Sequence, residues 1–247
     1  MNFEEVRSLV PILKDIIYLS NGNIGICNTR VKEAMTNFLS ELESGFKFVE
    51  KWSSEIDDAN NLFAELIGGR GEEVVGIPNT TTGINLVAHM IDPERGSNVV
   101  VNDLEFNTST YPWLSRRKDG VDVKWVNCVN GEILLEDVEK AVDDQTSALV
   151  VSHVSWISGF RQNLKALSEI AHDHGAYLIV DAAQSTGAVT IDVKKGDIDF
   201  LACCSFKWLL GPPGAGFLYV RRDLIEKFEP PLPGYMGVQN PYNFDIW

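Results

Sequence analysis

Short apolar runs recur along the chain and alternate with segments in which apolar and polar residues follow a helical spacing. Such continuous apolar runs are typical of parallel strands that are covered on both faces. They predict seven strands, over residues 74–77, 99–102, 123–126, 148–153, 177–181, 200–205 and 217–220. The alternation starts near residue 55. It predicts an α/β fold, a three-layer α/β/α sandwich around a mixed, mostly parallel sheet of about seven strands.

One of the intervening segments carries clear helix signals. Its apolar positions between residues 164 and 171 share one helical face. Asn163 precedes them as an N-cap, and Gly175 suits the end of the helix. In sheets of this class, ligands bind beyond the carboxyl ends of the strands. We therefore expect the chemistry of this protein at residues that directly follow the apolar runs.

The composition narrows the classes of function. The chain has 247 residues, 45% of them hydrophobic, which suffices for one large domain with a buried core. The net charge of −14 and the lack of a basic stripe argue against a nucleic-acid partner. We expect no membrane association, because no apolar stretch reaches the roughly 18 residues of a membrane helix. Without the pattern of a secretory signal peptide, we expect a cytoplasmic protein whose four cysteines are reduced packing residues.

Asp181 ends one of the predicted strands, in the string YLIVDAAQSTG. A buried carboxylate is costly unless a cation or a hydrogen-bond donor compensates it. Two interpretations stay open from the residues alone. The side chain caps the next helix, or it keeps the nitrogen of a pyridine ring protonated so that the ring acts as an electron sink.

Lys207 lies between two apolar runs, in the string CCSFKWLLGPPGAGFLYV. Lysine is rarely buried, because its ammonium group is costly to desolvate. A lysine that forms an imine with an aldehyde accounts for this position. The alternative is a lysine at a strand end whose ammonium group reaches solvent.

A third signal is the string IPNTTTGINLVA, in which a strand ends, hydroxyl groups follow and a helix begins. Free amides and hydroxyls at a helix N-terminus form a site for anions. Thr80 and Thr81 are the candidate phosphate contacts. An ordinary threonine N-cap explains the local pattern almost as well.

Together these motifs resemble the class V aminotransferases, a family of fold-type I enzymes that depend on pyridoxal 5'-phosphate. The family includes cysteine desulfurases, kynureninases and isopenicillin epimerase-like proteins. The resemblance lies in the order and spacing of the motifs, with Gln184 three residues and Lys207 26 residues after Asp181. The resembling segments span nearly the whole chain and read YLSNGNIG, NTTTGINLVA, NDLEFNTSTYPW, VVSHVSWISGF, LIVDAAQSTGAV and CCSFKWLLGPPGAGFLYVRR.

The resemblance implies a role for each of the candidate residues. Thr80 and Thr81 would bind the cofactor's phosphate, and Asp181 would pair with the pyridine nitrogen. Gln184 would contact the phenolic oxygen of the ring. Lys207 would form the internal aldimine.

The chain departs from the desulfurase pattern at several of the corresponding positions. Phe106 falls where the family places its ring-stacking residue, which is His in cysteine desulfurases; a flat Phe ring can also stack. Trp156 stands where desulfurases carry Asn. Cys204 and Phe206 replace a phosphate-binding Ser and His, and the adjacent Ser205 would compensate for the lost hydroxyl. We therefore discount cysteine desulfurase activity without excluding it.

We predict a PLP-dependent enzyme that acts on an amino acid through a Lys207 aldimine, as an aminotransferase, a lyase or an epimerase. The first alternative is a truncated, non-catalytic remnant of the fold that serves as a binding or assembly module. The second is a cysteine desulfurase or selenocysteine lyase. A nucleotide-binding Rossmann domain fits poorly, because no G-x-G-x-x-G follows the first strands. The histidines show no metal-ligand grouping, so we expect no metal; His153 is either near the cofactor or a core residue.

The resemblance also implies how the domains are arranged. Residues 1–20 would begin a small domain, residues 21–230 would form the large PLP-binding domain, and residues 231–247 would be a linker or lining segment. The rest of the small domain would follow and is absent from this sequence. We expect a homodimer with active sites near the subunit interface. The tail supports this, because it carries apolar and aromatic residues typical of a contact surface, among them Leu232, Tyr235, Met236, Tyr242, Phe244 and Trp247. Packing of the tail on its own domain is the alternative.

Overall fold

The computed structural model describes residues 2–234. Its strands form one mixed sheet in the order β1-β7-β6-β5-β4-β2-β3. Their bounds are β1 (Val74–Ile77), β2 (Asn98–Asn102), β3 (Asp122–Val126), β4 (Thr146–Ser152), β5 (Tyr177–Asp181), β6 (Phe200–Cys204) and β7 (Gly216–Val220). All seven predicted strands are confirmed, each within two residues at either end.

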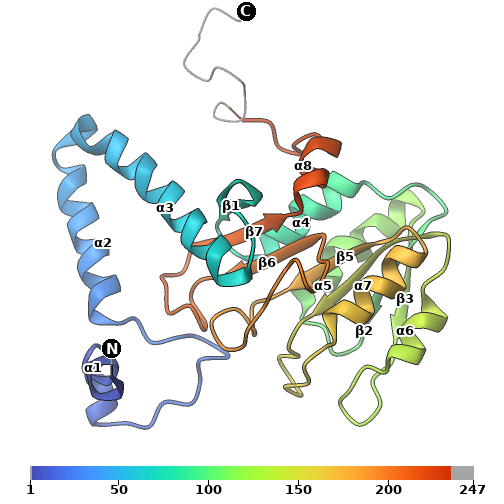
Figure 1. The fold of residues 1–247 in the computed structure, drawn as a ribbon, viewed down its shortest axis with the longest axis horizontal. Helices are drawn as coiled ribbons and strands as arrows, with labels where there is room; N and C mark the ends of the chain where they lie inside the picture. Colours follow the sequence, from blue (N-terminus) through green and yellow to red (C-terminus); the bar gives the residue numbers. More distant parts are fainter. Residues whose placement is uncertain (1, 235–247) are drawn as a thin grey trace, which may run out of the picture.

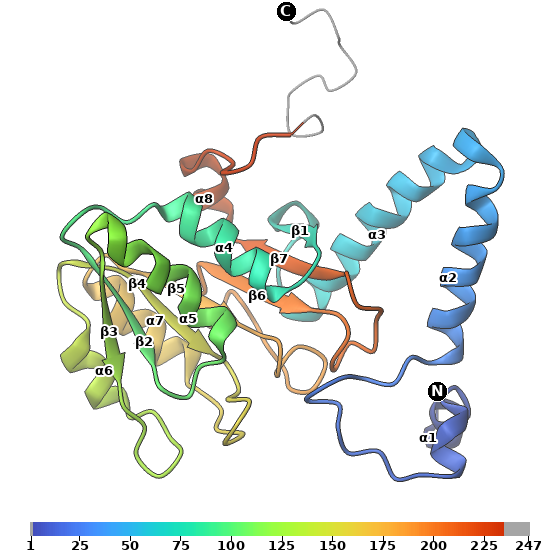
Figure 2. The ribbon, with the colours of Figure 1, turned by 180° about the vertical axis from the view of Figure 1, so that it is seen from behind.

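Helices flank the sheet on both faces. The α-helices are α1 (Phe3–Ser8), α2 (Thr29–Leu42), α3 (Val49–Ile67), α4 (Thr80–Ile91), α5 (Asn107–Leu114), α6 (Leu135–Ala141), α7 (Leu164–Asp173) and α8 (Arg222–Lys227). Short 3₁₀ helices cover Pro11–Lys14, Gly45–Phe48, Gly71–Glu73 and Ser115–Asp119. Helices α6 and α7 lie in front of the sheet in Figure 1, and α4 and α5 lie in front of it in the reverse view of Figure 2. The predicted α/β/α sandwich is confirmed.

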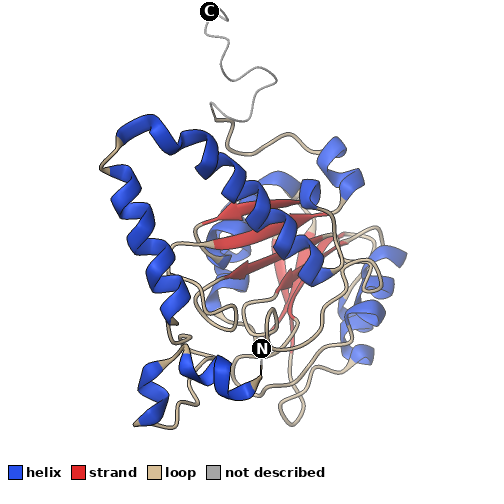
Figure 3. Cartoon of the chain, turned by 60° about the vertical axis from the view of Figure 1, so that its left-hand side comes forward, coloured by secondary structure: helices blue, strands red, loops and turns tan. Residues whose placement is uncertain are grey.

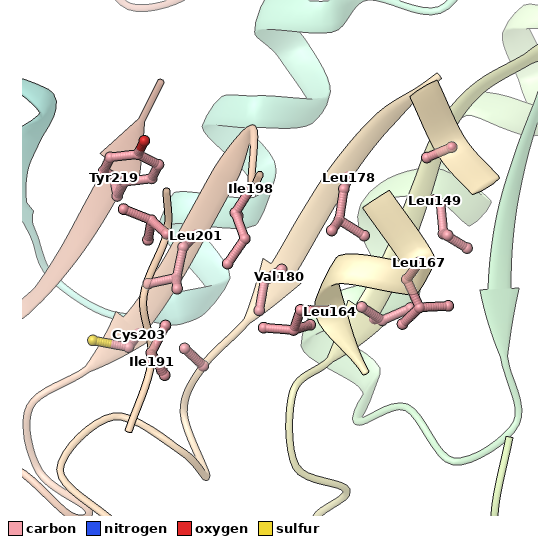
Figure 4. Packing of buried hydrophobic residues seen from close by; sticks show 14 of the residues in the cluster. Leu149, Leu164, Leu167, Leu178, Val180, Ile191, Ile198, Leu201, Cys203 and Tyr219 are labelled. Atoms are coloured by element: carbon pink, nitrogen blue, oxygen red, sulfur yellow. The ribbon is translucent and has the colours of Figure 1, made fainter. Parts of the chain in front are cut away.

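Two separate clusters of buried side chains hold these layers together. One lies between the sheet and helices α3, α6 and α7, and the other lies between the sheet and helices α4, α5 and α8. Figure 4 shows Leu164 and Leu167 of α7 packed against side chains of β4 and β5. Asn163 caps α7 by accepting a hydrogen bond from the amide of Ala166, and Gly175 follows the helix with φ +73°. The helix signals read from this segment are therefore confirmed.

The direction of the strands brings several chain segments to one edge of the sheet. β2, β4, β5 and β6 pair in parallel. β7 is antiparallel to both β6 and β1, so β1 runs in the same direction as the parallel strands. β3 pairs in parallel with β2, so the carboxyl ends of six strands meet at one edge, which is where the sequence predicts the chemistry.

The N-terminal helices extend away from the sheet, as Figures 1 and 3 show for α2 and the first half of α3. Helix α2 has no buried residue, and several of its large apolar side chains are exposed: Met35, Phe38, Leu39 and Leu42. Of the tail expected to form a contact surface, Leu232 is described and exposed, while residues 235–247 lie outside the described range. Within residues 2–234, no helix is long and apolar enough to cross a bilayer.

Candidate active site

A cavity lies at the carboxyl edge of the sheet, where the predicted site residues converge. Its lining comes from loops and helix starts that are far apart in the sequence. The lining residues are Asn79, Thr80, Thr81, Phe106, Thr108, Ser152, Trp156, Asp181, Ala183, Gln184, Cys204, Phe206 and Lys207. The structure thus brings together six of the seven residues that the sequence singled out as catalytic or cofactor-binding.

Asp181 lies at the end of β5 and is only 5% exposed. Its Oδ1 accepts a 2.8 Å hydrogen bond from the amide of Ala183, and its Oδ2 accepts a 3.0 Å bond from the hydroxyl of Ser109. Burial raises the pKa of this carboxyl above its ordinary value, and the two donors and the charge of Lys207 partly offset that rise. A cationic N–H entering the cavity would favour the charged form further.

Lys207 is half-buried in the turn that follows β6. Its Nζ lies 5.9 Å from the centroid of the Phe106 ring, within the range of a cation–π contact. In the part of the chain that the structure describes, its ammonium group forms no salt bridge. The backbone of this turn is held from the N-terminal segment, because the amide of Gly25 donates a 2.6 Å hydrogen bond to the carbonyl of Phe206.

Two aromatic side chains form one wall of the cavity. The rings of Phe106 and Trp156 meet edge to face, with centroids 5.5 Å apart and an angle of 79° between their planes. Both side chains remain about half exposed, at 47% and 49%. The Phe106 ring therefore has a fixed neighbour on one edge and is free to cover a flat ligand in the cavity.

Hydroxyl groups gather where helix α4 begins. Asn79 caps this helix by accepting a 2.9 Å hydrogen bond from the amide of Thr82. The hydroxyls of Thr81 and Thr108 lie 2.9 Å apart, and the buried Oγ1 of Thr80 has no hydrogen-bond partner among the described residues. A buried hydroxyl without a partner is costly, so a ligand oxygen at this point would stabilise the site. The N-terminus of the helix favours a negatively charged ligand.

Gln184 lines the cavity, but protein groups already engage its amide. Its Nε2 donates a 2.7 Å hydrogen bond to the carbonyl of Gly22, and its Oε1 accepts a 2.9 Å bond from the indole of Trp208. The second N–H of the amide is the part left for the phenolic oxygen that the resemblance assigns to it. The side chain also ties the N-terminal segment to the turn that carries Lys207.

Two of the singled-out residues do not line this cavity. Ser205 is buried, and its hydroxyl donates a 2.7 Å hydrogen bond to the carbonyl of Pro212. His153 faces a different surface pocket, where its Nε2 accepts a 3.2 Å bond from Nε of Arg161. Burial and the charge of Arg161 lower the pKa of His153 to about 4.

Sequence reasoning missed three of the polar residues near the cavity. Thr108 and Ser109 come from α5, and Ser152 ends β4. The string NTST after Phe106 begins a helix with hydroxyl groups, which is the same signal that pointed to Thr80 and Thr81. Ser152 could have been found as the polar residue that ends an apolar run.

Comparison with known proteins places this chain in a family. A family model described as Aminotransferase class-V matches residues 18–243. A probable cysteine desulfurase of Methanothermobacter thermautotrophicus is 35% identical over 240 residues, which make up 95% of this chain and 60% of that protein. The uncharacterized aminotransferase YcbU of Bacillus subtilis is 31% identical over 97% of this chain and 64% of its own length.

A solved structure agrees with these sequence matches. The apo structure of cysteine desulfurase from Thermococcus onnurineus NA1 superposes with a TM-score of 0.84 at 31% identity. That match covers 95% of this chain and 61% of the other. The chain therefore spans less than two thirds of the length of the relatives it matches.

Proposed function

Because this chain belongs to the class V aminotransferase family, we propose that it is the cofactor-binding part of a pyridoxal-phosphate enzyme that acts on an amino acid. Enzymes of this family use pyridoxal 5'-phosphate. One observation carries the proposal: Lys207 and Asp181 line the same cavity as Thr80, whose buried hydroxyl has no partner among the described residues.

The side chains of the cavity fit the chemical groups of this cofactor. A phosphate suits the start of α4, where Thr80 and Thr81 offer hydroxyls and the helix offers free amides. A pyridinium N–H suits Asp181, which is buried and retains acceptor capacity on both oxygens. An aldehyde carbon suits Lys207, and a flat ring suits the exposed face of Phe106.

In the proposed reaction, Asp181 and Lys207 would have different roles. When bound, the cofactor withdraws electrons from the α-carbon of the amino acid attached to it. Asp181 would hold a proton at the ring nitrogen, which favours that withdrawal. Lys207 would hold the cofactor's aldehyde carbon through Nζ, and its free amine would carry a proton to or from the α-carbon.

Within the family, we propose a transferase, lyase or epimerase reaction. Among residues 2–234, the cavity lining contains no histidine. Cys204 is its one cysteine, and burial raises the pKa of that thiol, which disfavours the nucleophilic thiolate. A cysteine desulfurase is the second candidate, because curated relatives such as that of Methanothermobacter thermautotrophicus bear that description. A non-catalytic binding module is the third candidate.

The partner we propose is a second copy of this chain. The exposed apolar side chains of α2, such as Phe38 and Leu39, support a contact surface on the extended helices. The described start of the tail adds Leu232, which is 74% exposed. Light scattering of the purified chain at micromolar concentration is expected to give twice the monomer mass. A monomer would reject the dimer and leave the cofactor assignment standing.

Borohydride trapping tests the cofactor proposal directly. After incubation with pyridoxal 5'-phosphate and reduction, mass spectrometry should find the added mass on the peptide that contains Lys207. Lys207→Ala should lose this label, while Lys195→Ala, which removes an exposed lysine, should keep it. A label that persists in Lys207→Ala would overturn the assignment.

Turnover separates the three candidates. An enzyme of the first kind should exchange the α-hydrogen of at least one amino acid in heavy water, with loss of exchange in Lys207→Ala. Sulfide release from cysteine would favour the desulfurase. Labelling of Lys207 without exchange or sulfide release for any amino acid would favour the binding module.

A further inference from the structure

The side chain of Glu105 joins the ends of two strands next to the cavity. Its Oε1 accepts 2.7 Å hydrogen bonds from the side-chain amide of Asn102 and from the backbone amide of Ser152. Its Oε2 accepts a 2.5 Å bond from the hydroxyl of Ser152. Asn102 ends β2 and Ser152 ends β4. One carboxylate therefore connects the loop after β2 to the neighbouring strand.

This loop leads directly into the proposed cofactor site. Phe106 follows Glu105 and precedes α5. The first turn of α5 carries Thr108, whose hydroxyl meets that of Thr81, and Ser109, whose hydroxyl donates to Asp181. Residues 103–106 belong to no helix or strand. The amide of Asp103 donates a 3.1 Å bond to the carbonyl of Val126 in β3, and Leu104 is buried in the core. Glu105 supplies the side-chain bonds from this segment to β4.

Burying the carboxylate of Glu105 costs desolvation free energy, which an apolar side chain at this position would not cost. Burial raises the pKa of Glu105 to about 7. The hydrogen bonds from Ser152 and Asn102 lower this pKa, and the nearby charge of Asp181 raises it. An apolar residue could fill the same space without this penalty. What a carboxyl group adds is directional bonds to two oxygens, which at a pH above about 7 are charge-assisted and so stronger than neutral ones.

We propose that Glu105 is a positioning residue, which ties the segment carrying Phe106 and Ser109 to the end of β4 and so fixes both against the cofactor. This inference rests on the proposed function. The tie ends at Ser152. This residue is paired with Asp181 in the register of β4 and β5. The Phe106 ring and Ser109, which donates to Asp181, are thereby both held relative to the end of β4.

Three variants of the chain test this role. Glu105→Ala removes the tie and is expected to weaken pyridoxal-phosphate binding about tenfold, as the loss of a charge-assisted hydrogen bond does. It should also reduce the circular dichroism of the bound cofactor at equal occupancy, because the surroundings of the ring become less fixed. Glu105→Gln keeps an acceptor for the Ser152 amide and a donor for its hydroxyl. It should restore affinity to within about threefold of the wild type.

Asp103→Ala is the matched control. Asp103 lies in the same loop and its carboxylate accepts a 2.8 Å hydrogen bond from the amide of Cys128, so the substitution also removes a loop contact. It does not touch β4, and we expect it to leave the cofactor signal unchanged. Equal losses in Asp103→Ala and Glu105→Ala, or a wild-type signal in Glu105→Ala, would overturn the positioning role.

A readout without cofactor separates this inference from the proposed function. In the cofactor-free chain, Glu105→Ala should speed hydrogen–deuterium exchange of the amides of residues 106–109, and Glu105→Gln should not. If Glu105→Ala misfolds, Ser152→Ala removes one bond of the tie and should give a smaller change in the same direction. Unchanged exchange in both variants would reject the tie. Absence of a label on wild-type Lys207 would reject the proposed function, while faster exchange would still support the tie.

Discussion

The hydroxyl of Ser109 donates a 3.0 Å hydrogen bond to Oδ2 of Asp181, across 72 positions of the sequence. Ser109 itself is fully buried, so water cannot take over this role. A donor to a carboxylate favours its charged form, and the Ser109 hydroxyl accordingly acts against the rise in pKa that burial causes. The bond therefore helps to keep Asp181 anionic, which pairing with a ring nitrogen requires.

Ser109→Ala is expected to raise the pKa of Asp181 further. Protonation of Asp181 removes its pairing with the cofactor, so the loss of cofactor affinity on acidification should begin at a higher pH than in the wild type. Fluorescence titrations with pyridoxal 5'-phosphate at a series of pH values measure this shift. Ser115→Ala removes a hydroxyl just after the same helix that donates to the carbonyl of Pro112 and not to Asp181, and should not shift the profile. Identical profiles for Ser109→Ala and the wild type would contradict the argument.

Asp181→Asn separates chemistry from stability. Loss of the charge that holds the ring proton should slow α-hydrogen exchange by about 10²–10³. The cofactor-free variant should be more stable at neutral pH than the wild type. The reason is that a carboxyl whose folded pKa is raised destabilises the fold as pH rises above its unfolded value of 3.8. Urea unfolding at several pH values measures this effect. An Asp181→Asn variant with wild-type exchange would mean that the carboxylate only caps the turn after β5.

Gly25 lies too close to the Lys207 turn to accept a side chain. An added Cβ would lie 2.1 Å from the carbonyl oxygen of Lys207 and 2.9 Å from Cδ2 of Leu210. Gly25→Ala should therefore displace the N-terminal segment or the turn, with a loss of about 1–3 kcal/mol in unfolding free energy and weaker labelling of Lys207. Gly234→Ala, where a Cβ would meet nothing within 4 Å, is the control. Normal labelling and stability in Gly25→Ala would show that the segment is not packed on the turn.

The strands were predictable because parallel strands are buried on both faces. In β5, for example, Leu178, Ile179 and Val180 are all fully buried, which leaves a continuous apolar run in the sequence. Helix α2 gave no such signal. Helix α2 buries no residue. Its apolar face therefore packs against no surface among the described residues, and its pattern alone did not identify it as a helix. Sequence patterns report burial, and they are weakest where an element stands apart from the core.

The lining of the candidate cavity was predictable where a residue ends a strand, and less so where the direction of neighbouring side chains decides which of them lines the cavity. Cys204 and Ser205 are adjacent, yet Cys204 lines the cavity while the hydroxyl of Ser205 turns to Pro212. Successive side chains at a strand end point to opposite faces, so the choice depends on the register of β6. The sequence also could not show that Gln184 binds Gly22, because that contact spans 162 positions.

His153 provides a test of the electrostatics away from the cavity. It is 2% exposed, and burial and the charge of Arg161 lower its pKa to about 4, against an ordinary value of 6.5. Between these two values the unfolded chain binds a proton that the folded chain does not. The free energy of unfolding should therefore fall as the pH drops from 6.5 to 4, by up to about 1.4 kcal/mol per pH unit from this residue.

His153→Gln isolates this contribution, since glutamine does not titrate and its amide oxygen can still accept from Arg161. Glu105 acts in the opposite sense over part of the same range, because its folded pKa is raised to about 7. The measurement is therefore the slope of the free energy of unfolding against pH, obtained from urea unfolding between pH 6.5 and 4 and compared between variant and wild type. The variant should lose stability less steeply on acidification. Equal slopes would mean that His153 takes up its proton in the folded chain, which would require the Arg161 contact to open.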